Sequence, residues 1–418
     1  MLLTVSKRLE FSASRRLFVK DWSDSENRAA FGPETSARYG TGRNYSAYFI
    51  FSGEIDQDTG MLMNISEIKT RVHDVLRTGF DHKFLNEDNK AFANIPPTTK
   101  NIARELFART APLFSDARAQ LTAVHLSESE EDRTATCYAS GALESNYWFR
   151  FSAARQTTSP RLTVEENRKL FGVAASPLGH GHNYRARLTF RSESDEGDGP
   201  LVRFADMQER ISSLRTELDH KNLNREVLAL IDQPITTENL ARYIHERVSE
   251  KIRIHRVRLY ERYDFFAEYW DGGKYFLGLQ APFAAAHRLQ SSKFNPEVNA
   301  ALYGKCNNAR GHGHAYMTEA TIGGSFDERS ATVIDLVKFR AAVTEAVEPW
   351  RDKHLDLELD AFKNRPSTGE NIVEALWEQL DPRLEDRLMR LRLWETPNNK
   401  FTLRRIHQRA QVLVGGGV

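Results

Sequence analysis

The chain has 418 residues, a formal net charge of +1 and 28% charged residues. This near-neutral balance gives no reason to expect a nucleic-acid or membrane partner, and no apolar run reaches the roughly 18 residues that a membrane span needs. Two cysteines, Cys137 and Cys306, are too few for a disulfide framework and indicate a reducing compartment. The N-terminus also lacks the apolar core of a signal peptide. We therefore expect a cytoplasmic protein with several small units.

Five landmarks recur three times in the same order, with a period of roughly 130–140 residues. An opening strand ends at Arg15, Arg155 and His287, and a second strand begins at Thr41, His180 and His312. Next come Asp81-His82, Asp219-His220 and, in the third copy, Arg351-Asp352. A helix then starts at Thr98, Thr236 and Thr368, and each copy closes on a strand with a glutamate, Glu128, Glu261 and Glu395. The chain is thus three copies of one unit, residues 1–135, 136–270 and 271–418.

The second copy shows the elements of the unit most clearly. Residues Tyr184–Phe190 alternate like a strand, and Asp206–Leu218 carry a helical period. A threonine cap at Thr236 or Thr237 opens a second helix through Ser249, and Val257–Tyr260 form the last strand. Such a unit is α+β, with helices on one face of an antiparallel sheet.

The third copy holds a dense group of side chains that can do chemistry. His312 and His314 are two residues apart on a strand and therefore face the same side. His287 on the opening strand can complete a set of three imidazoles, which keeps a fourth zinc position open for substrate. Cys306 lies just upstream, as a candidate base or nucleophile. The alternative is a polar hairpin edge with Cys306 as a small buried hydrophobe.

These motifs resemble those of the 6-pyruvoyl-tetrahydropterin synthase family. The chain has Phe-Ala-Ala-Ala-His ending at His287 and Cys-Asn-Asn-Ala-Arg-Gly-His-Gly-His-Ala-Tyr over Cys306–Tyr316, with five residues between Cys306 and His312. The related 6-carboxytetrahydropterin synthases usually have a shorter gap. The resemblance implies three tandem tunnelling-fold units whose antiparallel sheets join into a pseudo-threefold, twelve-stranded β-barrel ringed by helices. It also implies that two such rings could pair as a homodimer.

The first two copies have lost the full ligand set. Copy 2 has Arg155 at the first ligand position and Ala174 at the cysteine position, and copy 1 has Arg15, Thr41, Arg43 and Thr35 at the corresponding positions. Arginine stays protonated and has no lone pair to donate to a metal. We therefore expect one Zn²⁺ per chain, held by the third copy, and favour a structural role for His180 and His182. The arginines would act as substitutes for the metal charge or bind an anion.

The Asp-His pairs are distributed the other way round: copies 1 and 2 have them, and copy 3 has Arg351-Asp352 in their place. The resemblance implies that this pair works with the cysteine in a site shared between neighbouring subunits, so copy 3 would take the pair from another copy. Either Asp81-His82 or Asp219-His220 can supply it; we favour the second, since Leu218–Asn224 is nearest the family pattern. His354 is a local alternative, and a turn-forming role for the pairs is the simpler one.

The resemblance implies elimination of triphosphate from 7,8-dihydroneopterin triphosphate. The glutamates Glu395, Glu261 and Glu128 would hold the pterin ring, since a carboxylate accepts two parallel hydrogen bonds from an N–H/NH2 edge, and Thr368 is a further candidate substrate contact. Two alternatives remain open. One is side-chain cleavage to a 6-carboxy or 6-hydroxymethyl pterin, as in deazaguanine or folate synthesis; the other is a non-catalytic pterin- or purine-binding protein.

Overall fold

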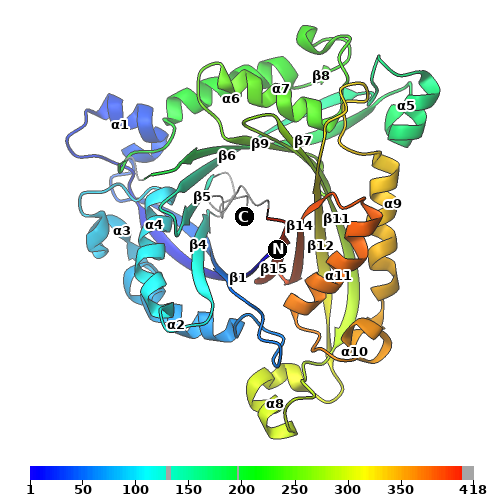
Figure 1. The fold of residues 1–418 in the computed structure, drawn as a ribbon. Coiled ribbons are helices and arrows are strands. Elements are labelled where there is room, and N and C mark those ends of the chain that lie inside the picture. The colour runs from blue at the N-terminus through cyan, green and yellow to red at the C-terminus, as the bar shows by residue number, and fades with distance from the viewer. Residues whose placement is uncertain (129–132, 195–196, 407–418) are drawn as a thin grey trace.

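The computed structural model describes residues 1–128, 133–194 and 197–406. Its sheet has fifteen strands, of which three are two-residue strands beside the main ring. The other twelve follow one another as antiparallel neighbours and close on themselves through the β10–β11 pair. Figure 1 shows this ring with the helices around its outside. The predicted twelve-stranded α+β barrel is confirmed.

The first repeat contributes four long strands to the ring. Its elements are β1 (Leu2–Arg15), α1 (Asp24–Phe31), β2 (Thr41–Ser52), α2 (Ile65–Gly79), β3 (Lys83–Phe84), α3 (Leu85–Asp88), α4 (Thr99–Thr110), β4 (Gln120–Ser127) and β5 (Arg133–Tyr138). The order across the sheet is β1, β2, β4 and β5.

The second repeat has the same order of elements. They are β6 (Leu143–Arg155), α5 (Val164–Phe171), β7 (His180–Ser192), α6 (Phe204–Leu218), β8 (Lys221–Asn222), α7 (Thr237–Ser249), β9 (Arg256–Arg262) and β10 (Phe265–Trp270). The strand over Tyr184–Phe190 and the two helices expected in this copy are confirmed. Val257–Tyr260 lie in β9, but the prediction that they form the last strand is wrong, because β10 follows.

The third repeat completes the ring. Its elements are β11 (Lys274–His287), α8 (Pro296–Tyr303), β12 (His312–Gly323), α9 (Leu336–Val347), β13 (Lys353–His354), α10 (Leu355–Glu358), α11 (Gly369–Arg383), β14 (Leu388–Thr396) and β15 (Asn399–Arg404). The expected helix starts are found in all three repeats, since Thr98, Thr236 and Thr368 each accept a hydrogen bond from the backbone at the third helical residue.

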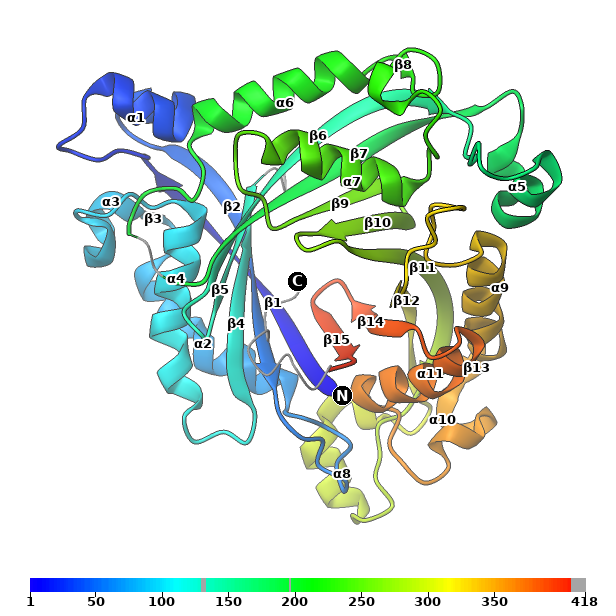
Figure 2. The same cartoon turned by 45° about the horizontal axis from the view of Figure 1, so that its top comes forward.

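Three seams join the repeats. β5 pairs with β6, β10 with β11, and β15 with β1. The third pairing brings the two ends of the described chain together, as the neighbouring blue and red strands show in Figure 2. Closure gives each of the twelve long strands a neighbour on both sides over at least part of its length, which removes the free edge strands of an open sheet.

The three repeats share one register around the candidate ligand positions. Arg15 pairs with Thr41, Arg155 with His180, and His287 with His312. Beneath each position a tyrosine stacks on a phenylalanine across the strands, at ring distances of 4.8–4.9 Å. The outer face of the sheet thus packs against the helices in the same way three times, and residues in the same column can be compared directly.

At each seam, the first turn of a helix on the outside of the ring also forms a hydrogen bond with the neighbouring repeat. Lys100 on α4 donates to the Gly197 carbonyl of repeat 2 at 2.6 Å, and Glu238 on α7 accepts from the Thr332 hydroxyl of repeat 3. Glu370 on α11 accepts from the Leu62 amide of repeat 1 at 2.9 Å. These contacts fix the order of the repeats around the ring.

A search for long apolar helices over the described residues found none that could cross a bilayer.

Candidate active site

The three histidines predicted as metal ligands converge in repeat 3. One ligand atom from each of His287, His312 and His314 lies within 4.8 Å of the others, and the Nε2 atoms of His287 and His312 are 3.2 Å apart. The strand register explains this, because His287 lies opposite His312 and Ala285 opposite His314. All three imidazoles therefore project from the helix-facing side of neighbouring strands.

The imidazoles are held in a form that can donate a lone pair. His287 is fully buried, and its Nδ1–H donates to the Ser367 carbonyl at 2.9 Å, which leaves Nε2 free to accept. Burial, together with the nearby charges of His287 and His314, lowers the pKa of His312 to about 4. Neutral histidines with an oriented second nitrogen are what a zinc site requires. The residues present therefore fit a three-histidine zinc centre.

Cys306 is in the 3-10 turn Gly304–Asn307, directly after α8. It is half-buried, and its sulfur does not belong to the three-histidine cluster found among the described residues. Burial, with a smaller contribution from the charge of Glu395, raises the pKa of the Cys306 thiol, and Lys305 acts in the opposite direction. The thiol is thus outside the histidine cluster and within electrostatic range of Glu395.

Glu395 lies at the end of β14, with one carboxylate oxygen 3.9 Å from Nε2 of both His287 and His314. Its other oxygen accepts from the Asn399 side chain at 3.2 Å. Asn399 in turn accepts from Lys7 of repeat 1 at 2.9 Å. The carboxylate therefore lies beside the histidines at the seam between repeats 3 and 1.

In repeat 2, the carboxylate of the equivalent glutamate is already bound by other side chains of the protein. Arg155, at the position of His287, forms a buried ion pair with Glu261. The Thr237 hydroxyl donates to the same carboxylate, and His182 lies 3.0 Å from its other oxygen. Burial opposes ionisation of Glu261, but Arg155 together with His182 and Thr237 outweighs it and holds the pKa of the carboxyl well below its usual range. His180 and His182 still approach Glu261 closely enough to resemble a metal cluster, but a fixed guanidinium occupies the third position.

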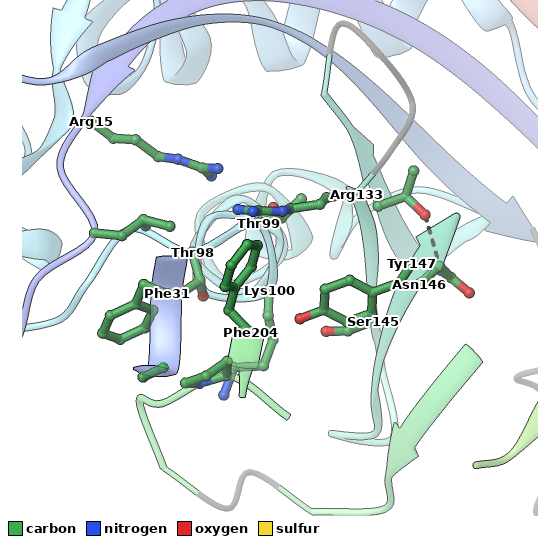
Figure 3. A pocket seen from close by; sticks show the side chains of 14 residues that line it. Arg15, Phe31, Thr98, Thr99, Lys100, Arg133, Ser145, Asn146, Tyr147 and Phe204 are labelled. Carbon is green, nitrogen blue, oxygen red and sulfur yellow. Dashed lines mark hydrogen bonds between the residues drawn. The ribbon is translucent and has the colours of Figure 1, made fainter. Parts of the chain in front are cut away.

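Repeat 1 shows the same replacement. The fully buried Arg15 pairs with Glu128 at 2.6 Å, and Arg43 reaches the same carboxylate at 3.3 Å. The Thr99 hydroxyl also donates to Glu128. Figure 3 shows the Arg15 guanidinium directed into the hollow at the seam with repeat 2, where Phe204 projects between the surrounding side chains. About 50 Å³ remains for solvent in this hollow, whereas Glu128 itself lines the larger cavity shared with repeat 3.

One equivalent position in the three repeats explains why Glu395 makes fewer contacts within the protein than Glu128 and Glu261. Thr99 and Thr237 each hydrogen-bond their glutamate, but repeat 3 has Gly369 at that position. Phe401 lies 2.0 Å from where a Gly369 Cβ would be, so no side chain fits. Without this hydroxyl and without an arginine partner, Glu395 keeps hydrogen-bonding capacity for a ligand. In the other two repeats, the glutamate that was expected to hold the pterin ring forms an ion pair within the protein instead.

The strand order settles which Asp-His pair borders this site. β12 pairs with β14 only from Met317 onward, and β1 pairs with β15 only as far as Lys7. The upper parts of β12 and β1 therefore flank an open gap, about 14 Å wide for three strand spacings. β3 lies on that open edge of β1, because β2 occupies the other edge.

Asp81 and His82 are fixed at this edge. Asp81 accepts from the Ser12 amide at 3.0 Å, the His82 amide donates to the Ser12 carbonyl at 2.6 Å, and the two side chains are 3.0 Å apart. The His82 side chain is 84% exposed, so it is available to a ligand in the gap.

Asp219-His220 occupies the corresponding place one seam away. β8 pairs with the edge of β6 that faces repeat 1, where Glu128 is already paired with Arg15. Our preference for this pair as the partner of repeat 3 is therefore corrected in favour of Asp81-His82. The sequence could not reveal this, because the direction in which the ring is connected depends on which strands pair at the seams.

Two other candidate site residues, His354 and Thr368, make contacts other than the predicted ones. His354 aligns with Phe84 and Asn222, and its Nε2 lies 2.7 Å from the position of a Gly311 Cβ. It therefore packs beside the start of β12 in its own repeat. Thr368 is buried, caps α11 and donates to the Gly60 carbonyl at 2.6 Å. Its hydroxyl is thus engaged within the protein.

A cavity of about 850 Å³ opens where repeats 3 and 1 meet at the barrel mouth. His314, Trp394 and Glu395 line it from repeat 3, and Glu10 and Asn44 from repeat 1. The hollow containing His82 also includes Asn44 and therefore adjoins this cavity. A bicyclic ring with a charged tail fits within such a volume.

Family comparison agrees with this geometry. Three stretches, residues 4–139, 146–272 and 277–406, match the family model of 6-pyruvoyl tetrahydropterin synthase. The chain belongs to this family.

Individual members of the 6-pyruvoyl tetrahydropterin synthase family each match about a third of the chain. The 6-pyruvoyl tetrahydrobiopterin synthase of Drosophila melanogaster is 34% identical over 132 residues, which is 31% of this chain and 79% of the relative. That of Homo sapiens is 36% identical over 119 residues, 28% of this chain and 82% of the relative. The solved 6-pyruvoyl tetrahydropterin synthase of Caenorhabditis elegans is 32% identical, with a TM-score of 0.31, and covers 31% of this chain and 95% of its own.

Sequence reasoning about this family member missed three site residues. Lys7 and Asn399 connect repeat 1 to Glu395, but neither belongs to a repeated motif. Gly369 was visible as a break in a column that otherwise holds threonine. Its importance appears only once the threonine hydroxyls are seen to bind the glutamates.

Proposed function

We propose that the chain is a zinc-dependent lyase of the 6-pyruvoyl-tetrahydropterin synthase type, which eliminates triphosphate from 7,8-dihydroneopterin triphosphate. The observation that carries the proposal is the freedom of Glu395 beside a complete three-histidine set, while Glu128 and Glu261 are tied to arginines. Family membership and the curated relatives support the reaction class.

Glu395 is proposed to orient the substrate. Its carboxylate can accept two parallel hydrogen bonds from the N–H/NH2 edge of the pterin, with Asn399 already bound to one oxygen. Holding the ring there places its side chain next to the histidines, two of which, His287 and His314, lie 3.9 Å from the same carboxylate. Positioning of this kind can account for a large part of the rate enhancement.

Cys306 is proposed to remove a carbon-bound proton from the substrate side chain. His287, His312 and His314 would hold the zinc ion, which supplies Lewis-acid stabilisation for negative charge on the substrate's hydroxyl oxygens. His82, oriented by Asp81, is proposed to return a proton across the seam, and the triphosphate leaves with the electron pair of the broken C–O bond. Each repeat alone lacks one of these parts.

Three lysines, Lys7 with Lys69 and Lys305 near it, support an anionic tail on the substrate. Burial lowers the pKa of Lys7, and the charges of Lys69 and Lys305 lower it further, while Glu395 opposes them. The columns of Lys7 and Lys69 hold Tyr147 and Gln208 in repeat 2. This concentration of positive charge occurs at the one seam with a complete histidine set, where a triphosphate would relieve the repulsion.

The experiment compares Glu395→Gln with Glu261→Gln, using turnover of dihydroneopterin triphosphate. Glutamine replaces one acceptor oxygen by a donor that opposes the ring amine, so kcat/KM of Glu395→Gln should fall by roughly 10–100-fold, the effect of one charge-assisted hydrogen bond. Glu261→Gln should keep the rate and lose stability. Equal loss of turnover in both variants would remove the repeat 3 assignment.

A second reaction remains a candidate because of one match. The dihydroneopterin monophosphate aldolase of Pyrococcus furiosus is 30% identical over 93 residues, which is 21% of this chain and 75% of the relative. That name describes cleavage of the side chain. Mass spectrometry of the pterin product separates the reactions, since elimination keeps all three side-chain carbons.

A further inference from the structure

A hollow of about 340 Å³ opens on repeat 3, where the loop before α8 meets the loop before α11. Four cationic side chains line it, those of Arg288, Lys293, Lys363 and Arg365. Gln57 of repeat 1 completes the wall at the seam. We call this the basic hollow; none of the residues that line it also lines the cavity with His314 and Glu395.

Repeat 3 alone has all four of these cations. The loops of the three repeats can be aligned residue by residue, because one asparagine in α1, α5 and α8 and another in α4, α7 and α11 bind the loop carbonyls in the same way. At the four equivalent positions repeat 1 has Arg16, Asp21, Ala93 and Ile95, and repeat 2 has Gln156, Arg161, Ile231 and Gln233. The shared fold therefore does not require this concentration of positive charge.

The seam between repeats 2 and 3 shows how this space is filled elsewhere. Arg161 donates to the Glu328 carbonyl at 2.5 Å, and the Ser159 hydroxyl donates to the Arg329 carbonyl at 2.5 Å. The loop of the next repeat is thereby fastened over the equivalent position. Among the described residues, Lys293 makes no such contact with repeat 1, so its ammonium group stays available at the seam between repeats 3 and 1.

Two of the four cations have no carboxylate partner. Arg288 donates from Nε to the Asn307 carbonyl at 3.2 Å, and no acid in the described parts of the chain pairs with the rest of its guanidinium group or with Lys293. Asp356, the one acidic residue in the lining, accepts from the Arg288 backbone amide at 2.7 Å, and its side chain is only 11% exposed. The positive charge of these two side chains is therefore open to a ligand.

The other two cations have only surface partners. Lys363 lies 2.6 Å from Asp360, and both side chains are well exposed. Arg365 is 3.9 Å from Glu374 and 3.5 Å from Glu378, which is longer than a normal charge-assisted hydrogen bond. Exposed ion pairs of this kind contribute little to stability, so an anion of higher charge can replace these carboxylates.

We propose that the basic hollow binds a polyphosphate, with its oxygens between the two loops. Linked phosphates present several charged oxygens within a short span, which arginine and lysine N–H groups bind well. The inference does not depend on the proposed function, because none of the four cations holds the metal, the pterin ring or a transferred proton. The same chemistry describes a free inorganic polyphosphate and the tail of a phosphorylated substrate, and the experiment separates these two sources.

The test is calorimetric titration of the full chain with inorganic triphosphate. The double variant Lys293→Asp/Lys363→Ala introduces the residues that repeat 1 carries at the same positions, so the fold should tolerate it. Its affinity for triphosphate should fall by roughly 10–100-fold, the effect of one or two charge-assisted contacts. The control variant Lys20→Ala/Lys90→Ala removes two lysines from the corresponding loops of repeat 1 and should bind triphosphate as the wild type does.

A third variant separates the charge of Arg288 from its contact with the turn that carries Cys306. In repeat 2, Gln156 at this position donates from Nε2 to the Ala175 carbonyl at 3.0 Å, as Arg288 does to the Asn307 carbonyl. Arg288→Gln should therefore keep the turn in place and still weaken triphosphate by about 10-fold, through loss of one charge-assisted contact.

Steady-state kinetics with 7,8-dihydroneopterin triphosphate identify the source of the phosphates. A higher KM in the double variant would assign the hollow to the tail of the substrate, and an unchanged KM would assign it to a free polyphosphate; either result supports the proposal. The proposal is overturned if wild-type protein does not bind triphosphate, if the double variant binds it as tightly as the wild type, or if only Lys7→Met/Lys69→Gln loses binding. A chain without turnover would refute the proposed function and leave the titration unaffected.

Discussion

Arg155 offers a direct way to test whether repeat 2 is a metal site blocked by a single side chain. Arg155 occupies the column of His287 and pairs with His180, as His287 pairs with His312. His180 and His182 already lie with Glu261 in a cluster whose ligand atoms are within 4.8 Å of one another. Arg155→His should therefore complete a second set of three imidazoles, and zinc content should rise from one to two equivalents per chain.

The energetic consequences follow from the burial of the ion pair. Arg155 and Glu261 are both buried, so removal of the guanidinium leaves a carboxylate without its main partner, at a cost of about 3–5 kcal/mol. Zinc at 1,000 times its dissociation constant would restore about 4 kcal/mol, because it binds only the folded state. Denaturant midpoints of Arg155→His should thus fall in the presence of a chelator and recover when zinc is added.

The matched control is Arg155→Met, which removes the charge and supplies no donor nitrogen. It should lose the same stability and show no recovery with zinc. Elemental analysis that finds one zinc in both variants, with equal denaturant midpoints, would refute the idea that Arg155 stands in place of a metal. Turnover should not increase in Arg155→His, since repeat 2 has Ala174 in the cysteine column.

Three further predictions follow from the site and its surroundings. Cys306→Ala should keep zinc and lose roughly 10²–10⁴-fold in turnover, as expected for a positioned proton-transfer group, whereas Cys137→Ala, buried in β5, should keep its rate; wild-type turnover by Cys306→Ala would remove the proposed base. His82→Ala should lose a similar factor and His220→Ala should not, in the same steady-state assay; the reverse result would mean that the seams are connected in the other direction. Burial raises the pKa of Glu370 to about 8 from 4.5, so the folded state retains a proton that the unfolded chain releases, and stability should decline as the pH rises from about 5 to 8. Glu370→Gln should flatten that decline in urea titrations, and an unchanged slope would contradict a buried neutral carboxyl.

Much of the architecture could be predicted because the same columns recur three times. The repeated strand ends and helix caps established the unit, and the three-histidine set could be read from His287, His312 and His314. Which repeats meet at each seam could not be predicted, since this depends on β15 pairing with β1. The ion pairs of Glu128 and Glu261 could not be predicted either. The sequence shows arginines at the ligand positions, but only the packing shows that each arginine binds the glutamate of its own repeat.

The central claim is that the seam between repeats 3 and 1 is a single catalytic centre for elimination of triphosphate. The most direct measurement is mass spectrometry of the pterin formed from 7,8-dihydroneopterin triphosphate by the zinc-loaded chain, together with quantification of released inorganic triphosphate. We expect a 6-pyruvoyl product and one triphosphate per turnover. A 6-carboxy or 6-hydroxymethyl pterin, or no turnover by protein that contains one zinc per chain, would contradict it.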